Sequence, residues 1–180
     1  ALGLWAGLRN VYPEARELRC WNHRIMNIVD RIKKRDQATA VELLRKVAYA
    51  ESREKAVEAK TEFQSWCKAT GHAKAAELID EDWDRMVAFF DFPKEHWQHL
   101  RTTNPVESPF AALRLRTNAA KRFKKVENAT CVVWKMLTVA ESRFRKLNAP
   151  ELLTDVWKGV EFIDGVKKTQ AEKQDRKRVV

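Results

Sequence analysis

The feature of this sequence that most constrains its fold is a helical periodicity of apolar side chains from residue 36 to residue 92. Apolar residues recur every three or four positions in three groups: Val41, Leu44, Val47 and Ala48; Val57, Phe63, Trp66 and Cys67; and Ala75, Leu78, Ile79, Trp83, Met86, Val87 and Phe90. This spacing places each group on one face of a helix. The pattern predicts three helices with a small common core, the second of them ending near Gly71.

Most of the remaining chain is also predicted to be helical. Only 5 Gly and 5 Pro occur in 180 residues, a composition that favours helices. Residues 2–11 and 25–32 have helical spacing, and further helices are expected from Asn104, after Asn128 and from Pro150. Glu17–Trp21 is short and alternating, as in a strand, and a turn is expected at 162–166. The sequence therefore predicts a mostly α protein with an α+β remnant.

The net charge of +10 is unevenly distributed along the chain. Residues 1–35 carry +5 and residues 101–146 carry +8, whereas residues 36–98 between them carry −4. Two basic segments around an acidic one favour a polyanionic partner, because side chains that neutralise phosphates release condensed counterions. The alternative is an ordinary solvated basic surface, and charge alone does not choose between the two.

Hydropathy and cysteine usage favour a cytoplasmic protein. No apolar run approaches the ~20 residues that a membrane-spanning helix needs, and no basic-then-apolar signal segment opens the chain. Cys20, Cys67 and Cys131 are odd in number and far apart, which favours reduced thiols. The chain begins with Ala1 and not with Met, so we also expect it to be a fragment or an incomplete gene product.

The segment 100–108 (LRTTNPVES) interrupts the helical pattern and carries the candidate catalytic residue. Asn104 is a good N-cap, Pro105 suits the first helical position, and Glu107 can complete a capping box. Capping by itself explains these residues. The same geometry also holds a carboxylate rigidly enough to bind Mg²⁺ or Mn²⁺, and Arg114, two turns further along the same face, could bind a phosphate.

Several segments resemble Mutator-type bacterial insertion-sequence transposases in order and spacing. Residues 101–108, followed by Phe110 and by 114–117 (RLRT), are similar to the block that carries the third acidic residue of that family. Residues 1–5 (ALGLW) resemble those that follow the family's second catalytic Asp. Residues 12–23 resemble its Cys-x2-His signature, and residues 90–97 resemble the approach to the Glu block. The resemblance extends from residue 1 to about residue 160.

This resemblance implies a DDE-type transposase, in which two Asp and one Glu bind two divalent cations, Mg²⁺ or Mn²⁺, and DNA is cleaved and joined at mobile-element ends. It implies that residues 1–35 end a ribonuclease-H-like catalytic domain and that residues 36–98 form an all-helical insertion. Residues 99–160 would then contain the Glu-bearing helix and the basic helices after it. Residues 161–180 are expected to be a charged, disordered tail.

The resemblance also assigns site residues. Glu107 is the one catalytic carboxylate that it places within the chain, since both Asp would precede residue 1. We therefore predict that the isolated chain is inactive, because one carboxylate rarely holds Mg²⁺. Cys20, His23, Asn104 and Arg114 are expected in the vicinity of the active site. DNA is the expected partner, and self-association is expected of the intact parent protein.

Cys20 and His23 also admit a different interpretation, as half of a zinc site that His96 and His99 would complete. The two pairs are separated by 72 intervening residues, and a Trp occupies an intervening position in each pair. The sequence therefore favours a buried thiol and a hydrogen-bonded histidine near the end of a strand.

Basic side chains around and beyond Glu107 form the candidate DNA-binding set: Arg101, Arg114, Arg116, Lys121, Arg122, Lys124 and Lys125. Contacts from such residues to phosphates position DNA without reading its sequence. The alternative for 114–125 is a solvated loop after a helix. Trp83 and Trp134, each with apolar neighbours at helical spacing, are predicted to lie in the core and not to stack on bases.

Two other functions are consistent with these residues. The first is a catalytically inactive helical remnant that only binds DNA. The second is a helical interaction module whose acidic segment 36–98 binds a protein. Salt-dependent DNA binding would separate the interaction module from the other two.

Overall fold

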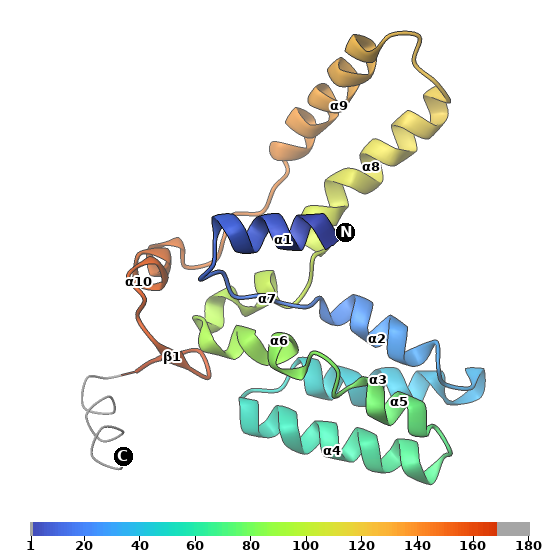
Figure 1. Cartoon of the computed structure of the whole chain (residues 1–180), viewed down its shortest axis with the longest axis vertical. Helices are drawn as coiled ribbons and strands as arrows, with labels where there is room; N and C mark the ends of the chain where they lie inside the picture. The colour runs from blue at the N-terminus through green and yellow to red at the C-terminus, as the bar shows by residue number, and fades with distance from the viewer. Residues whose placement is uncertain (1, 169–180) are drawn as a thin grey trace.

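The computed structural model describes residues 2–168, which form a mostly helical protein with one small sheet (Figure 1). The α-helices are α1 (Leu2–Val11), α2 (Trp21–Val29), α3 (Gln37–Ala48), α4 (Arg53–Ala69), α5 (Ala73–Leu78), α6 (Trp83–Val87), α7 (Trp97–Leu100), α8 (Asn104–Ala120), α9 (Val126–Glu141) and α10 (Leu153–Trp157). The 3₁₀ helices are η1 (Lys34–Asp36), η2 (Ala88–Asp91), η3 (Lys94–His96) and η4 (Pro150–Leu152). Strands β1 (Phe162–Ile163) and β2 (Val166–Lys167) pair antiparallel. The predicted mostly α fold is confirmed.

The hydrophobic core lies among α2 to α7 and is built largely from the predicted apolar groups. Leu44 of α3, Phe63 of α4 and Phe89 of η2 are completely buried. Burying a side chain of this size contributes about 1.5–3 kcal/mol. Helix α4 packs against both α3 and α5, and α2 packs against α3 and α5 (Figure 1). As predicted, α4 ends just before Gly71, which has a φ of +77°.

The third predicted helix is divided into α5, α6 and η2, so its continuity was predicted wrongly. The break follows α5, and Asp82 adopts a left-handed φ of 58°. The guanidinium of Arg24, buried in α2, donates hydrogen bonds to the carbonyl oxygens of Leu78 and Glu81. Carbonyls at a helix end have no partner within the helix, so a buried cation can satisfy them where the helix stops.

The strand predicted at Glu17–Trp21 is wrong. Residues 15–20 are neither helix nor strand, and α2 begins at Trp21. The backbone is held by helical regions instead: Arg19 N donates to Arg85 O at 3.3 Å, and Trp21 N donates to Arg101 O at 2.9 Å. An extended segment becomes a strand only beside another strand, and within residues 2–168 the two strands pair only with each other.

Helices α8 and α9 form a helical hairpin that extends away from the core (Figure 1). None of the described side chains of α9 is buried, and those half-buried lie at positions 129, 132, 133, 136, 137 and 140. Trp134 lies outside this stripe and is 66% exposed, so its predicted core position is wrong. Trp83 does pack against the core, as predicted.

The segment after α9 returns to the helical body. The turn predicted at 162–166 is confirmed as the β1–β2 hairpin, with Asp164 and Gly165 both at positive φ. Gly165 N donates to Phe90 O at 3.1 Å, and Lys94 N donates to Gly165 O at 3.3 Å. Residues 161–168 are therefore folded, which corrects the predicted start of the charged tail, and residues 169–180 lie outside the described residues. No helix within residues 2–168 combines the length and hydropathy that crossing a membrane requires.

Candidate functional site

The candidate site lies where the start of α2 meets the start of α8. Two backbone N–H groups join these regions: Trp21 N donates to Arg101 O at 2.9 Å, and Thr103 N donates to the sulfur of Cys20 at 3.4 Å. Trp21 is buried, and its indole N–H donates to Met86 O at 2.9 Å. The core therefore anchors the two segments that carry the predicted site residues.

Thr103 and Glu107 define the start of α8. Thr103 is the N-cap, so the predicted cap at Asn104 is displaced by one residue, and Asn104 is the first helical residue. Glu107 N donates to Thr103 O at 2.9 Å, and the Thr103 hydroxyl donates to Glu107 Oε1. Because the hydroxyl bonds to the carboxylate and makes no capping bond, the predicted capping box is not formed.

His23 lies beside the same carboxylate. Its Nε2 is 3.8 Å from Glu107 Oε1, and both side chains are about half exposed, at 57% and 47%. Cys20 is the N-cap of α2 and is half-buried. The structure thus brings Cys20, His23 and Glu107 close together, although Cys20 is not fully buried and no strand carries it.

Electrostatic coupling accompanies this arrangement. Burial acts to raise the pKa of the Cys20 thiol, but its hydrogen bonds with Thr103 and His23 outweigh that effect and lower the pKa to about 7. The pKa of His23 is raised by its hydrogen bond with Cys20, by the charge of Cys20 and, less strongly, by the charge of Glu107. A thiol with a lowered pKa and an imidazole with a raised pKa therefore lie beside Glu107.

Glu107 can supply one ligand to a divalent cation, but the described residues do not supply a complete set. Across the described residues, no group of three His, Cys, Asp or Glu side chains is placed to hold a metal ion. Mg²⁺ is commonly held by one or two carboxylates together with phosphate oxygens and water. The exposed carboxylate of Glu107 fits the role of one ligand among several.

His96 and His99 do not join Cys20 and His23 in a metal site. Instead, His96 Nε2 lies 3.1 Å from Ala149 O, and Asn148 N donates to His99 Nε2 at 3.4 Å. These two histidines bind the segment that follows α9.

Arg101 differs from the other predicted DNA-binding residues. Its guanidinium lies 4.9 Å, 5.0 Å and 5.4 Å from the ring centroids of Tyr49, Phe89 and Trp97, respectively. Burial lowers its pKa, and its Nε is buried without a hydrogen-bond partner in the described structure. The structure therefore packs Arg101 among aromatic rings, unlike the exposed members of the predicted DNA-binding set.

The other predicted basic residues are presented to solvent by the α8–α9 hairpin. Arg114 and Arg116 are exposed on α8, and Arg114 shares the face of Glu107 two turns away. Four exposed cations lie in the loop 121–125 at the tip of the hairpin: Lys121, Arg122, Lys124 and Lys125. This loop, termed the basic tip below, begins with Lys121 at a φ of 60°.

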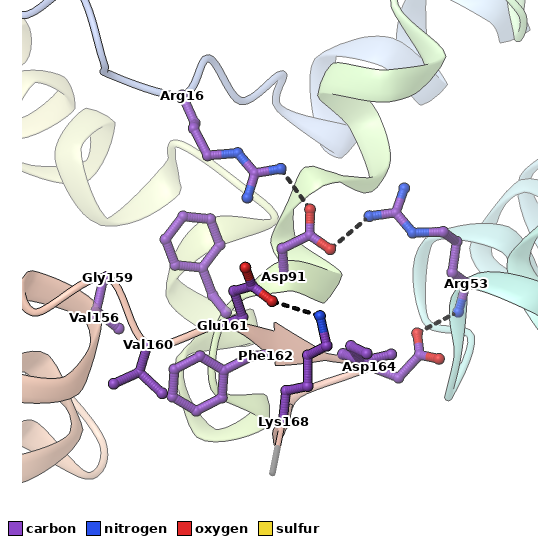
Figure 2. Close-up of a pocket in the computed structure, with 12 residues that line it drawn as sticks. Arg16, Arg53, Asp91, Val156, Gly159, Val160, Glu161, Phe162, Asp164 and Lys168 are labelled. Atoms are coloured by element: carbon purple, nitrogen blue, oxygen red, sulfur yellow. Dashed lines mark hydrogen bonds and ion pairs between the residues drawn. The ribbon is translucent and has the colours of Figure 1, made fainter. Parts of the chain in front are cut away.

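A separate pocket of about 520 Å³ lies between the β1–β2 hairpin, η2 and the start of α4. Figure 2 shows Asp91 between Arg16 and Arg53, with ion pairs to both, and Lys168 paired with Glu161. None of the predicted site residues lines this pocket. The carboxylate of Asp164 accepts a hydrogen bond from Arg53 N at 2.7 Å and so joins the β1–β2 hairpin to the helical body.

Sequence comparison assigns the chain to a protein family. A family model for transposases of the Mutator family matches residues 1–146. The chain belongs to this family. It is 38% identical over 166 residues to the transposase for insertion sequence element IST2 of Acidithiobacillus ferrooxidans, covering 92% of this chain and 56% of that protein. It is 36% identical over 165 residues to the transposase for insertion sequence element IS6120 of Mycolicibacterium smegmatis, covering 92% and 51%.

This Mutator-family chain thus spans about half the length of these relatives. No solved structure matches it. The matched region contains Cys20, His23, Glu107 and the whole α8–α9 hairpin. Sequence reasoning missed Thr103 as a site residue. The available signal was its position four residues before Glu107, a spacing that brings two side chains together along one side of a helix.

Proposed function

We propose that this chain supplies the third metal-binding carboxylate and a DNA-phosphate-binding hairpin to a transposase that cuts and joins DNA at the ends of mobile elements. The observation that carries this proposal is the convergence of Cys20, His23 and Thr103 on Glu107. These residues come from two segments about eighty positions apart, and both lie in the region matched by the family model. The relatives are transposases for insertion sequence elements.

In this proposal the catalytic domain has a ribonuclease-H-like core, with residues 36–98 as its helical insertion. Two Asp, contributed from outside this chain, complete the metal site with Glu107. Bound Mg²⁺ or Mn²⁺ would activate the attacking water or 3′-hydroxyl and stabilise the leaving oxygen at a DNA phosphodiester. The chain's own contribution is to hold one oxygen ligand at a rigid helix start.

His23 has a defined role in this arrangement. Its raised pKa favours the protonated imidazole near Glu107. The protonated imidazole, with Nε2 3.8 Å from Glu107 Oε1, can form an ion pair that holds the carboxylate at this place. The imidazole is also exposed, so it can donate a hydrogen bond to a DNA phosphate that enters the site.

The α8–α9 hairpin is proposed to bind the DNA backbone. Arg114 and Arg116 continue along α8 from Glu107, and the basic tip ends the hairpin. Such contacts supply affinity and register without sequence specificity. The protein would act in the bacterial cytoplasm, associated with the nucleoid, and two or more transposase copies would assemble on the element ends.

The catalytic role of Glu107 is tested in a joined protein. The part of the Acidithiobacillus relative outside the match is fused to this chain in the relative's order, and strand cleavage is measured on DNA carrying the relative's element ends. We expect metal-dependent cleavage that falls by about 10³-fold or more in Glu107→Gln, as for loss of a group that acts on transition-state charge. Glu127→Gln, an exposed carboxylate in the first turn of α9, is the matched control.

Two results would contradict this function. The first is full cleavage by Glu107→Gln in the joined protein. The second is cleavage by the isolated 180-residue chain after addition of Mg²⁺ or Mn²⁺ alone, because the chain would then need no further carboxylates.

A further inference from the structure

We propose that Thr103 is a positioning residue, which orients the carboxylate of Glu107 so that its Oε2 atom faces the divalent cation. This inference rests on the proposed function of Glu107. It is carried by the contacts of Thr103, which join Glu107 to the segment that bears Cys20.

The hydroxyl of Thr103 is used in an unusual way for an N-cap. An N-cap Thr normally accepts a hydrogen bond from the N–H of the second or third helical residue. The second residue of α8 is Pro105, which has no N–H, and the Thr103 side chain makes no capping bond. The hydroxyl donates to Glu107 Oε1 instead. Thr103 therefore gives up a capping interaction and holds the carboxylate.

Thr103 is itself held in place from the core. Its N–H donates to Cys20 Sγ, and the next residue after Cys20, Trp21, is 2% exposed. Trp21 donates through both of its N–H groups, to Arg101 O and to Met86 O, at 2.9 Å each. A series of contacts thus runs from the buried core through Trp21 and Cys20 to Thr103. These contacts fix the position of the Thr103 backbone, from which the hydroxyl reaches Glu107.

The two oxygens of Glu107 consequently differ. Oε1 accepts from Thr103 and lies 3.8 Å from His23 Nε2, whereas Oε2 accepts no side-chain hydrogen bond from the described residues. Without the Thr103 hydroxyl, the carboxylate of this half-exposed side chain would rotate among several orientations. Residues that orient a metal ligand in this way typically change metal affinity or activity by about 10–100-fold when they are removed.

The experiment measures strand cleavage by the joined protein as a function of Mg²⁺ concentration. Thr103→Val removes the hydroxyl at nearly constant shape, Thr103→Ser retains it, and Thr102→Val is a matched control at the neighbouring threonine. We expect Thr103→Val to lower the cleavage rate at low Mg²⁺ by about 10–100-fold and to raise the half-saturating Mg²⁺ concentration. Thr103→Ser should restore both values, and Thr102→Val should leave them unchanged.

Three outcomes would overturn the inference: a normal Mg²⁺ dependence in Thr103→Val, a Thr103→Ser as defective as Thr103→Val, or an equal defect in Thr102→Val. Thermal melting of each variant accompanies the assay. If Thr103→Val melts at a lower temperature than the unsubstituted protein, Thr103→Ala is assayed in its place. A normal Mg²⁺ dependence in Thr103→Ala would contradict the positioning role. Active Glu107→Gln would refute the proposed function, whereas inactive Glu107→Gln with fully active Thr103→Val would refute only the role of Thr103.

Discussion

At the scale of single residues, the site is defined by how each side chain uses its hydrogen bonds. Cys20 accepts from a backbone N–H, Thr103 donates to a carboxylate, and His23 lies between a thiol and Glu107. Arg101 belongs to the same sequence motif, but three aromatic rings surround its guanidinium. Neighbouring residues of one motif therefore divide between the site and the core.

The reactivity of Cys20 tests this geometry in the 180-residue chain. Iodoacetamide reacts with the thiolate, so the alkylation rate of Cys20 should rise with pH through a midpoint near 7, its lowered pKa. Thr103→Val should move the midpoint to higher pH, because hydrogen bonds from Thr103 lower the pKa. Peptide mass spectrometry separates Cys20 from Cys67, whose pKa burial raises to about 11 and which should stay unmodified. An unchanged midpoint in Thr103→Val would contradict the side-chain contribution of Thr103, since the backbone N–H that donates to Cys20 Sγ is retained in this variant.

At the scale of secondary-structure elements, the sequence pattern predicted the helices whose positions depend on neighbouring residues. Apolar spacing located α3, α4 and α9 to within a few residues, because helix periodicity is a property of neighbouring positions. The division between α5 and α6 was not predictable in this way, since Arg24, more than fifty residues earlier, satisfies the carbonyls there. The β1–β2 hairpin was recognised only as a turn, because its packing against η2 is a tertiary contact.

The β1–β2 hairpin offers a test of that packing at Gly165. Both Gly165 and Gly159 have positive φ, at +80° and +70°, but a Cβ on Gly165 would lie 2.6 Å from Lys94 Cβ, whereas one on Gly159 meets open space. Gly159→Ala should cost about 1–2 kcal/mol for its backbone conformation alone. Gly165→Ala should cost about 2–5 kcal/mol, since overpacking is added. Urea unfolding of the two variants gives the difference, and equal costs would show that the hairpin does not pack closely on Lys94.

At the scale of the whole molecule, the helical body has a buried core, whereas no described side chain of the α8–α9 hairpin is buried. The core lies in α2–α7, and the α8–α9 hairpin contributes exposed basic residues. Charge counting along the sequence predicted a basic segment beyond residue 100, because charge is read directly from composition. The proximity of Cys20 and His23 to Glu107 was expected only from the family resemblance. The residues themselves gave no sign of it, since the contact that joins the two segments, from Thr103 to Cys20, spans 83 positions.

The division of charge predicts how DNA binding depends on salt. Replacing the basic tip by alanine at Lys121, Arg122, Lys124 and Lys125 should reduce the slope of log K against log salt by about 3–4, because each lost phosphate contact removes about 0.9. The matched control replaces four exposed cations of the helical body: Lys34, Arg45, Lys68 and Lys74. Fluorescence anisotropy of a labelled duplex measures both. Equal losses in the two variants would indicate a general charge effect and contradict binding by the hairpin.

The length of α8 sets a further relation between Glu107 and the basic tip. The helix has 17 residues, with Glu107 in its first turn and Lys121 immediately after its end. At 1.5 Å per residue, the two positions are about 20 Å apart along the helix axis. A DNA duplex lying along α8 rises 3.4 Å per base pair, so the phosphates bound by the tip would be about six base pairs from the one cut at Glu107. In the proposed function, the length of α8 would therefore fix the distance between the bound DNA backbone and the cleavage position.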